Sequence, residues 1–144
     1  MQSAVRSQFS DLIWEHCDHS GFAAPPQLIE YIIDIVAERF DRPDFVPEPT
    51  FAESYLRLYA QYRPSLYREF ADSTLIFCSL LPDYGLRRGL NMDYYATMGI
   101  STYYALGDLS RDPRFTQLGN WFYHLQRFLC SALHRDRPLQ LVDW

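Results

Sequence analysis

Apolar residues recur at helical spacing along most of the chain, and the frequent turn signals that a β-rich chain would need are missing. A first helix is expected from about residue 4 to residue 19, with Gly21 as its C-terminal stop. Pro25 and Pro26 begin a second helix, because proline is tolerated in the first turn. The body of this helix, residues 28–40, is apolar nearly all round, which is typical of a helix in the middle of a bundle.

Prolines divide the middle of the chain. Three of them exclude a regular helix in residues 41–49, which we interpret as a crossover loop. Thr50 and Glu53 form a capping-box pattern that predicts a third helix beginning at Phe51. A fourth helix is expected over residues 65–81, and the next proline stops it.

Two more helices complete the pattern. Asn91 is a favourable N-cap for a fifth helix, which ends at about Leu106 before a glycine. The last and longest helix opens after Asp112 and ends near His134, leaving a short C-terminal tail. The sequence therefore predicts an all-α fold, a bundle of five to six helices in which residues 1–144 form a single domain.

Tyrosines are concentrated in the middle of the chain, where nine of the eleven lie between Phe51 and Tyr104. A tyrosine ring is large and apolar, and its hydroxyl needs a partner when it is buried. So many tyrosines indicate either a hydrogen-bonded core or a pocket or interface with an aromatic body and a polar edge.

All thirteen basic residues are arginine. The absence of lysine excludes Schiff-base, pyridoxal-phosphate and Walker-type phosphate sites, each of which depends on a lysine. Arginine favours planar, bidentate contacts with carboxylates and phosphates, and it stacks on aromatic rings.

The net charge of −5 is unevenly distributed. Residues 1–50 hold nine acids against three arginines, whereas residues 51–144 hold nine acids against ten arginines. An acidic chain without a basic stripe argues against nucleic acid as a partner. The asymmetry favours contacts between helices or between subunits instead.

The start of the chain and its cysteines indicate a cellular location. The first twelve residues lack the apolar core of a secretory signal, and the longest strongly apolar run, residues 75–81, is too short to cross a bilayer. Cys17, Cys78 and Cys130 are widely separated, so each is expected to be a small buried hydrophobe in a reducing compartment. We expect a cytoplasmic protein that has no membrane partner.

Two groups of residues are candidates for ligand binding. Arg63 and Tyr67 lie at the junction of the third and fourth helices, where aromatic walls and arginine donors would suit a small acidic or planar molecule. Arg87 and Arg88 precede the Asn91 cap, and a helix N-terminus beside two arginines is a potential anion site. The alternative at the junction is that the rings belong to the core and the arginines cover them. The alternative for Arg87 and Arg88 is a solvated pair in a surface loop.

Two pairs of tyrosines are candidates for an interface: Tyr94, Tyr95, Tyr103 and Tyr104. Adjacent tyrosines on a helix point to different faces, so not all of them can lie in one core, and tyrosine is enriched in interfaces. Gly99 lies between the pairs and leaves a notch for another helix or a ligand.

Patterns for catalysis and metal binding are weak. The chain has no GxSxG, HExxH, GxGxxG or P-loop motif. His16 and His19 share one helical face and could begin a zinc or iron site, but the Glu-x-x-His pairs of a di-iron bundle are missing, so we expect no metal and no cofactor. Asp34 and Asp72 lie within apolar helices, and each is expected to face an arginine or a helix end.

The pattern of residues 70–82, followed by Arg87-Arg88, Tyr94-Tyr95, Gly99 and residues 103–106, resembles that of uncharacterised bacterial all-helical proteins. The similar region spans about a quarter of the chain. The resemblance supports a bacterial, all-helical protein and implies no activity, cofactor or catalytic residue.

Three functions follow from these observations. The first is a non-enzymatic module that binds a protein partner, or itself as a homo-oligomer, through a surface rich in tyrosine and arginine. The second is a helical bundle that binds a small acidic or planar ligand near Arg63, Tyr67 and Arg87. The third is a metal-dependent enzyme centred on His16 and His19. The sequence favours the first.

Overall fold

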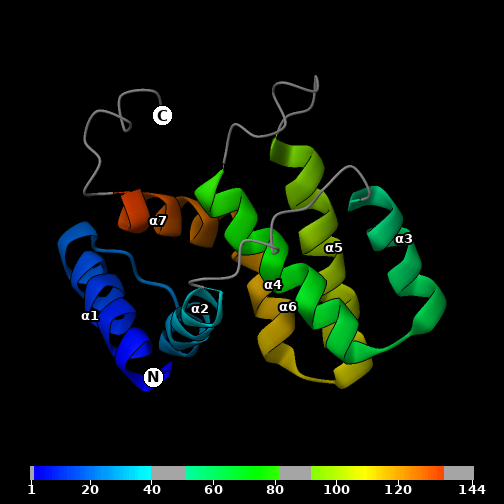
Figure 1. Cartoon of the computed structure of the whole chain (residues 1–144), viewed down its shortest axis with the longest axis horizontal. Helices are drawn as coiled ribbons and strands as arrows, with labels where there is room; N and C mark the ends of the chain where they lie inside the picture. The colour runs from blue at the N-terminus through cyan, green and yellow to red at the C-terminus, as the bar shows by residue number, and fades with distance from the viewer. Residues whose placement is uncertain (1, 40–50, 82–91, 135–144) are drawn as a thin grey trace.

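The structure is a computed structural model that describes residues 2–39, 51–81 and 92–134, and these residues form helices and no strand (Figure 1). The all-α prediction is therefore confirmed, and the seven helices of the described residues slightly exceed the expected five to six. The loop over residues 41–49 and the caps Thr50 and Asn91 lie outside the described residues. In chain order the helices are α1 (Gln2–Ser20), α2 (Pro26–Glu38), α3 (Phe51–Gln61), α4 (Pro64–Leu80), α5 (Met92–Ser110), α6 (Pro113–Asn120) and α7 (Phe122–His134).

Proline, aspartate and glycine set several helix ends where the sequence predicts them. A proline occupies the first turn of α2, α4 and α6, where its missing N–H costs no helical hydrogen bond. Asp112 caps α6, and its carboxylate accepts a hydrogen bond from the N–H of Arg114 at 3.0 Å. Gly21 ends α1 with a φ of 73°, and its N–H donates to the carbonyl of Cys17 at 2.9 Å.

Helix α2 lies in the middle of the core, as its apolar pattern predicts. Leu28, Ile32 and Ile33 have no exposed surface. Helix α1 packs along α2, and α4 and α6 also contact it (Figure 1). All three cysteines are buried and none forms a disulfide, which confirms that they are small core residues.

Helices α4 and α5 pack against each other and run antiparallel. The Tyr103 hydroxyl of α5 donates to Asp72 of α4, and the Tyr95 ring of α5 meets the Phe77 ring of α4. Residue numbers therefore fall along α5 as they rise along α4. The beginning of α4 and the end of α5 consequently lie at the same end of the bundle (Figure 1).

The structure corrects the prediction of one long C-terminal helix. The helix is divided into α6 and α7 at Trp121, whose ψ of 5° departs from the helical value. Gly119 and Asn120, both weak helix formers, precede the break.

The structure also corrects the expected end of the fifth helix. Helix α5 does not stop at Leu106 but continues to Ser110. Gly107 lies inside the helix, where a Cβ atom would come within 2.5 Å of the Thr116 hydroxyl oxygen. This glycine therefore serves the close approach of α6 rather than the end of α5.

Gly99 lies where another part of the chain packs closely against α5. The sequence predicts a notch at Gly99 for either another helix or a ligand, and the structure places packed side chains of the chain itself there. A Cβ atom at this position would lie 2.8 Å from the ring of Phe122 and 3.0 Å from a methyl carbon of Thr74. Phe122 has no exposed surface, so its ring cannot move into solvent.

We expect Gly99→Ala to lower the free energy of unfolding by about 2 kcal/mol, because the new methyl group overpacks the core. Gly119→Ala is the matched control, since its Cβ would meet the ring of Tyr104, which is 39% exposed and can move toward solvent, where water replaces its hydrogen bond to Asn120. We expect this control to change the free energy by about 0.5 kcal/mol or less. Urea unfolding followed by circular dichroism tests both, and equal effects would contradict the expectation.

Candidate functional site

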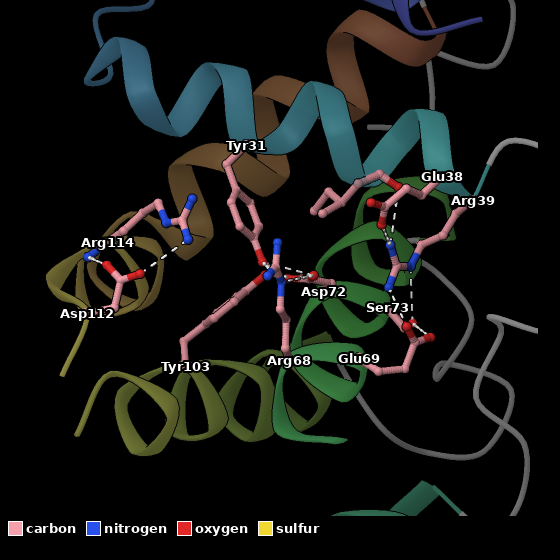
Figure 2. Close-up of polar contacts among 11 residues, drawn as sticks. Tyr31, Glu38, Arg39, Arg68, Glu69, Asp72, Ser73, Tyr103, Asp112 and Arg114 are labelled. Carbon is pink, nitrogen blue, oxygen red and sulfur yellow. Dashed lines mark hydrogen bonds and ion pairs between the residues drawn. The ribbon is translucent and has the colours of Figure 1, made fainter. Parts of the chain in front are cut away.

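A buried carboxylate lies where α2, α4 and α5 meet (Figure 2). Asp72 is 2% exposed. It accepts a hydrogen bond from the Tyr31 hydroxyl, whose oxygen lies 2.8 and 2.9 Å from the two carboxylate oxygens. It accepts a second from the Tyr103 hydroxyl at 2.7 Å. Both tyrosines are buried, so this carboxylate supplies the acceptor that each hydroxyl requires.

Burial decides the ionisation of this group. It raises the pKa of Asp72 to about 6, although the two tyrosine hydroxyls and the charges of Arg39 and Arg68 favour the ionised form. Burial also raises the pKa of both Tyr31 and Tyr103, and the neighbouring carboxylate adds to this effect. The two hydroxyls therefore remain protonated donors at neutral pH, and the carboxylate is the group that titrates.

Arg68 of α4 connects the buried carboxylate to the surface. Its Nε donates to the Tyr31 hydroxyl oxygen at 3.0 Å and lies 3.7 Å from the carboxylate of Asp72. The hydroxyl of Tyr31 thus accepts from the arginine and donates to the aspartate, as Figure 2 shows. The Arg68 side chain is 48% exposed, so the hydrogen-bond network of Asp72, Tyr31 and Arg68 reaches solvent at the arginine.

Arg114 of α6 lies on the same aromatic rings as Arg68. The rings of Tyr31 and Phe115 meet edge to face, with centroids 6.0 Å apart. The guanidinium carbon of Arg114 is 5.2 Å from the Tyr31 centroid and 5.1 Å from the Phe115 centroid, and that of Arg68 is 5.3 and 5.7 Å away. The ring faces attract both cations and so hold two like charges near each other.

Both arginines keep N–H groups for a further partner. Within the described residues, Arg68 makes its hydrogen bond through Nε, and the side chain of Arg114 makes one through Nη2, to Asp112 at 3.2 Å. Because both side chains are partly exposed, their remaining N–H groups are open to an acidic group from outside the chain.

Arg39, in contrast, is occupied by contacts within the chain. Its side chain is 2% exposed. It donates to Glu69 at 2.8 Å, to Glu38 at 3.3 Å and to Ser73 at 3.2 Å. These contacts join the end of α2 to α4 (Figure 2). Arg39 therefore has a structural role, and its buried N–H groups are not accessible to a ligand.

Two more arginines lie at the end of the bundle where α4 begins and α5 ends. Arg63 precedes α4 and Arg111 follows α5, and both are exposed. Neither has an ion pair with another described residue. Asp108 and Asp112 lie near Arg111 and Arg114 along the chain, and Glu69 and Asp72 lie near Arg68. We call this surface the basic end, and define it by Arg63, Arg68, Arg111 and Arg114.

The predicted ligand-binding residues have different surroundings. Arg63 is exposed, whereas Tyr67 is 1% exposed and its ring meets that of Tyr59 at 5.6 Å. Tyr67 is therefore a core ring, which agrees with the alternative that the sequence left open for this junction. Arg87 and Arg88 lie outside the described residues.

The four predicted interface tyrosines separate into core and surface. Tyr95 and Tyr103 are 2% and 0% exposed in the chain's own core, where a partner cannot reach them. Tyr94 is half-buried beside Tyr95. Tyr104 is 39% exposed, and its hydroxyl donates to Asn120 at 2.6 Å. An interface on α5 would therefore use Tyr94 and Tyr104.

The two histidines that could begin a metal site, His16 and His19, belong to no cluster of metal ligands in the part of the chain that the structure describes. His16 has its Nε2 3.0 Å from the Ser131 hydroxyl oxygen, and its ring meets that of Phe128. His19 is exposed near the end of α1. Across residues 2–39, 51–81 and 92–134, no group of three or more histidines, cysteines or acids is arranged to hold a metal ion.

Both acids of the apolar helices face an arginine, as the sequence predicts. Asp34 pairs with Arg6 at 2.5 Å, and Asp72 lies near Arg68. The sequence patterns do not single out Tyr31 or Arg114. A polar residue on the apolar face of a helix, such as Asp72, is the signal that a partner exists, but it does not identify the partner.

No protein family, no curated protein and no solved structure matches the chain. Among the described helices, none has the length and apolar character needed to span a membrane. The function must therefore be inferred from the geometry and charge of the chain itself.

Proposed function

We propose that the chain is a cytosolic, non-enzymatic interaction module whose basic end binds an acidic surface on a second copy. The observation that carries this proposal is the gathering of four arginines at one end of a chain whose net charge is −5. Two of them, Arg63 and Arg111, are exposed. The other two, Arg68 and Arg114, are held on aromatic rings, and their remaining N–H groups are available to hydrogen-bond a carboxylate. Arginines held in this way lose less side-chain freedom when they bind carboxylates.

A second copy offers a matching acidic surface on α1. Asp11, Glu15 and Asp18 follow one another at steps of four and three, so they lie on one face of the helix, and all three are exposed. Helix α1 lies at one side of the molecule, and the junction of α5 and α6 lies at the other (Figure 1). The two surfaces therefore meet between copies rather than within one.

Contact between two different surfaces makes a head-to-tail interface, which can continue from copy to copy. Exposed ion pairs contribute about 1 kcal/mol or less each, and salt screens them. Tyr62 and Leu109, which are 68% and 41% exposed beside Arg63 and Arg111, add apolar area to the basic end. We therefore expect weak association that increases with protein concentration and decreases with salt.

We expect charge reversal at the basic end, Arg63→Glu with Arg111→Glu, to weaken this association at least about tenfold, because it replaces attraction to α1 by repulsion. Charge reversal in the acidic surface of α1, Asp11→Arg with Asp18→Arg, should have the same effect. An equimolar mixture of the two variants should associate again, because each then presents one surface that complements the other. Sedimentation velocity at low and high salt measures all three.

Arg57→Glu is the matched control, because Arg57 is exposed on α3 and lies outside the basic end. It should associate as the unchanged chain does. Circular dichroism establishes that every variant is folded. A chain that stays monomeric at low salt, or a mixture that does not associate again, would contradict self-association through these two surfaces. Binding of an acidic peptide by the monomer would then indicate a different acidic partner.

A further inference from the structure

An open pocket of about 500 Å³ lies between the end of α1 and α7, formed in part by the connection from α1 to α2. It shares no residue with the basic end or with the acidic surface of α1 formed by Asp11, Glu15 and Asp18. Pockets that bind small molecules have volumes of about 300–1,000 Å³, so this one is large enough for a small aromatic compound.

Aromatic rings form the walls of the pocket. Phe22 and Phe128 stack at 4.4 Å with an interplanar angle of 13°, and Trp121 meets Phe22 edge to face at 6.0 Å. Phe22 and Trp121 are partly exposed although they pack against the core. Their exposed ring surface can therefore stack on a planar molecule.

The polar groups of the pocket are neutral or basic. His16, held near Ser131, lies on one side, and His124 and Arg127 are exposed on α7. Arg127 has no ion pair with another described residue. None of the described residues that line the pocket is acidic, although acids outnumber arginines in the whole chain. The charges of the residues that line the pocket therefore favour an anion over a cation.

We propose that this pocket binds a small planar aromatic molecule that carries one anionic group. The ring lies against Trp121 and Phe22, and the anionic group accepts hydrogen bonds from Arg127. The chemistry parallels the acidic or planar ligand that the sequence suggests, but the site is formed by residues 16–23 and 121–131 and does not include Arg63 or Tyr67. Ligand binding in this pocket does not depend on self-association, because the pocket is separate from the basic end and from the acidic surface of α1.

Isothermal titration calorimetry with 1-naphthoate and the uncharged 1-naphthamide tests the proposal, because the two probes share a ring system and differ in charge. We expect 1-naphthoate to bind with a dissociation constant of about 1 mM or tighter and 1-naphthamide to bind at least about fivefold more weakly. Trp121 lines the pocket, so 1-naphthoate should also change the tryptophan fluorescence.

Arg127→Gln should bring the two dissociation constants together by weakening 1-naphthoate alone, because an exposed arginine can be replaced without disturbing the core. Trp121→Leu should weaken both probes. Arg57→Gln, which removes an exposed arginine from α3, should change neither. Failure of both probes to bind would overturn the site. Equal binding of the two, or an unchanged ratio in Arg127→Gln, would overturn the anionic character of its ligand.

Discussion

Replacement of Asp72 by alanine is expected to lower the free energy of unfolding by about 3 kcal/mol at neutral pH. The substitution removes the acceptor of two hydroxyls, those of Tyr31 and Tyr103, which are 3% and 0% exposed. A buried donor without a partner costs about 1–3 kcal/mol, because it gave up its hydrogen bond to water on folding. Urea unfolding of the variant and of the unchanged chain measures the difference.

Asp34→Ala is the matched control for this prediction. Asp34 is also a helical aspartate paired with an arginine, but its side chain is 50% exposed. Water can replace the lost ion pair there, so we expect a change of about 1 kcal/mol or less. A similar loss in the two variants would show that burial of the Asp72 cluster contributes nothing specific.

A double-mutant cycle separates the hydrogen bond from other effects of the substitution. In a Tyr103→Phe background one hydroxyl is already gone, so Asp72→Ala leaves one fewer donor without a partner. We therefore expect Asp72→Ala to cost about 1–2 kcal/mol less in that background. Additive losses would indicate that the two side chains do not stabilise the fold through their contact.

The cluster around Asp72 also shows why sequence patterns predict the helices better than the site. Helical spacing, capping aspartates and leading prolines are local signals, and they locate α1, α2, α4 and α6 well. The partners of Asp72 are 41 and 31 residues away in the chain, at Tyr31 and Tyr103. Periodicity within one helix carries no information about which other helix approaches.

The errors at the helix ends have the same origin. Sequence patterns near Gly107 predict the end of a helix there. In the structure Gly107 lies inside α5, because the close approach of α6 leaves no room for a side chain. The basic end likewise exists because α4 and α5 run antiparallel, which brings Arg63 and Arg111 to one end of the bundle. The pocket combines residues 16–23 with residues 121–131, which no single-sequence pattern connects.

Asp72 should also make stability depend on pH, in the direction opposite to that of an ordinary ion-paired acid. Burial raises its pKa in the folded chain to about 6, from 3.8 for an exposed aspartate. Between these values the folded chain binds more protons than the unfolded chain, so the free energy of unfolding falls as pH rises through this window. The contribution is fully present below about pH 4 and is lost above about pH 7.

Comparison with Asp72→Asn isolates this contribution, because asparagine has nearly the same shape and does not titrate. From pH 7.5 to pH 4.5, the stability of the unchanged chain relative to that of the variant should increase by about 2 kcal/mol. Glu30 acts in the other direction, because its hydrogen bond to Arg6 lowers its pKa, but it is present in both chains and cancels. Urea unfolding at a series of pH values measures the difference. If the difference does not change with pH, Asp72 ionises in the folded chain as it does in the unfolded one, and its tyrosine and arginine partners offset the cost of burial.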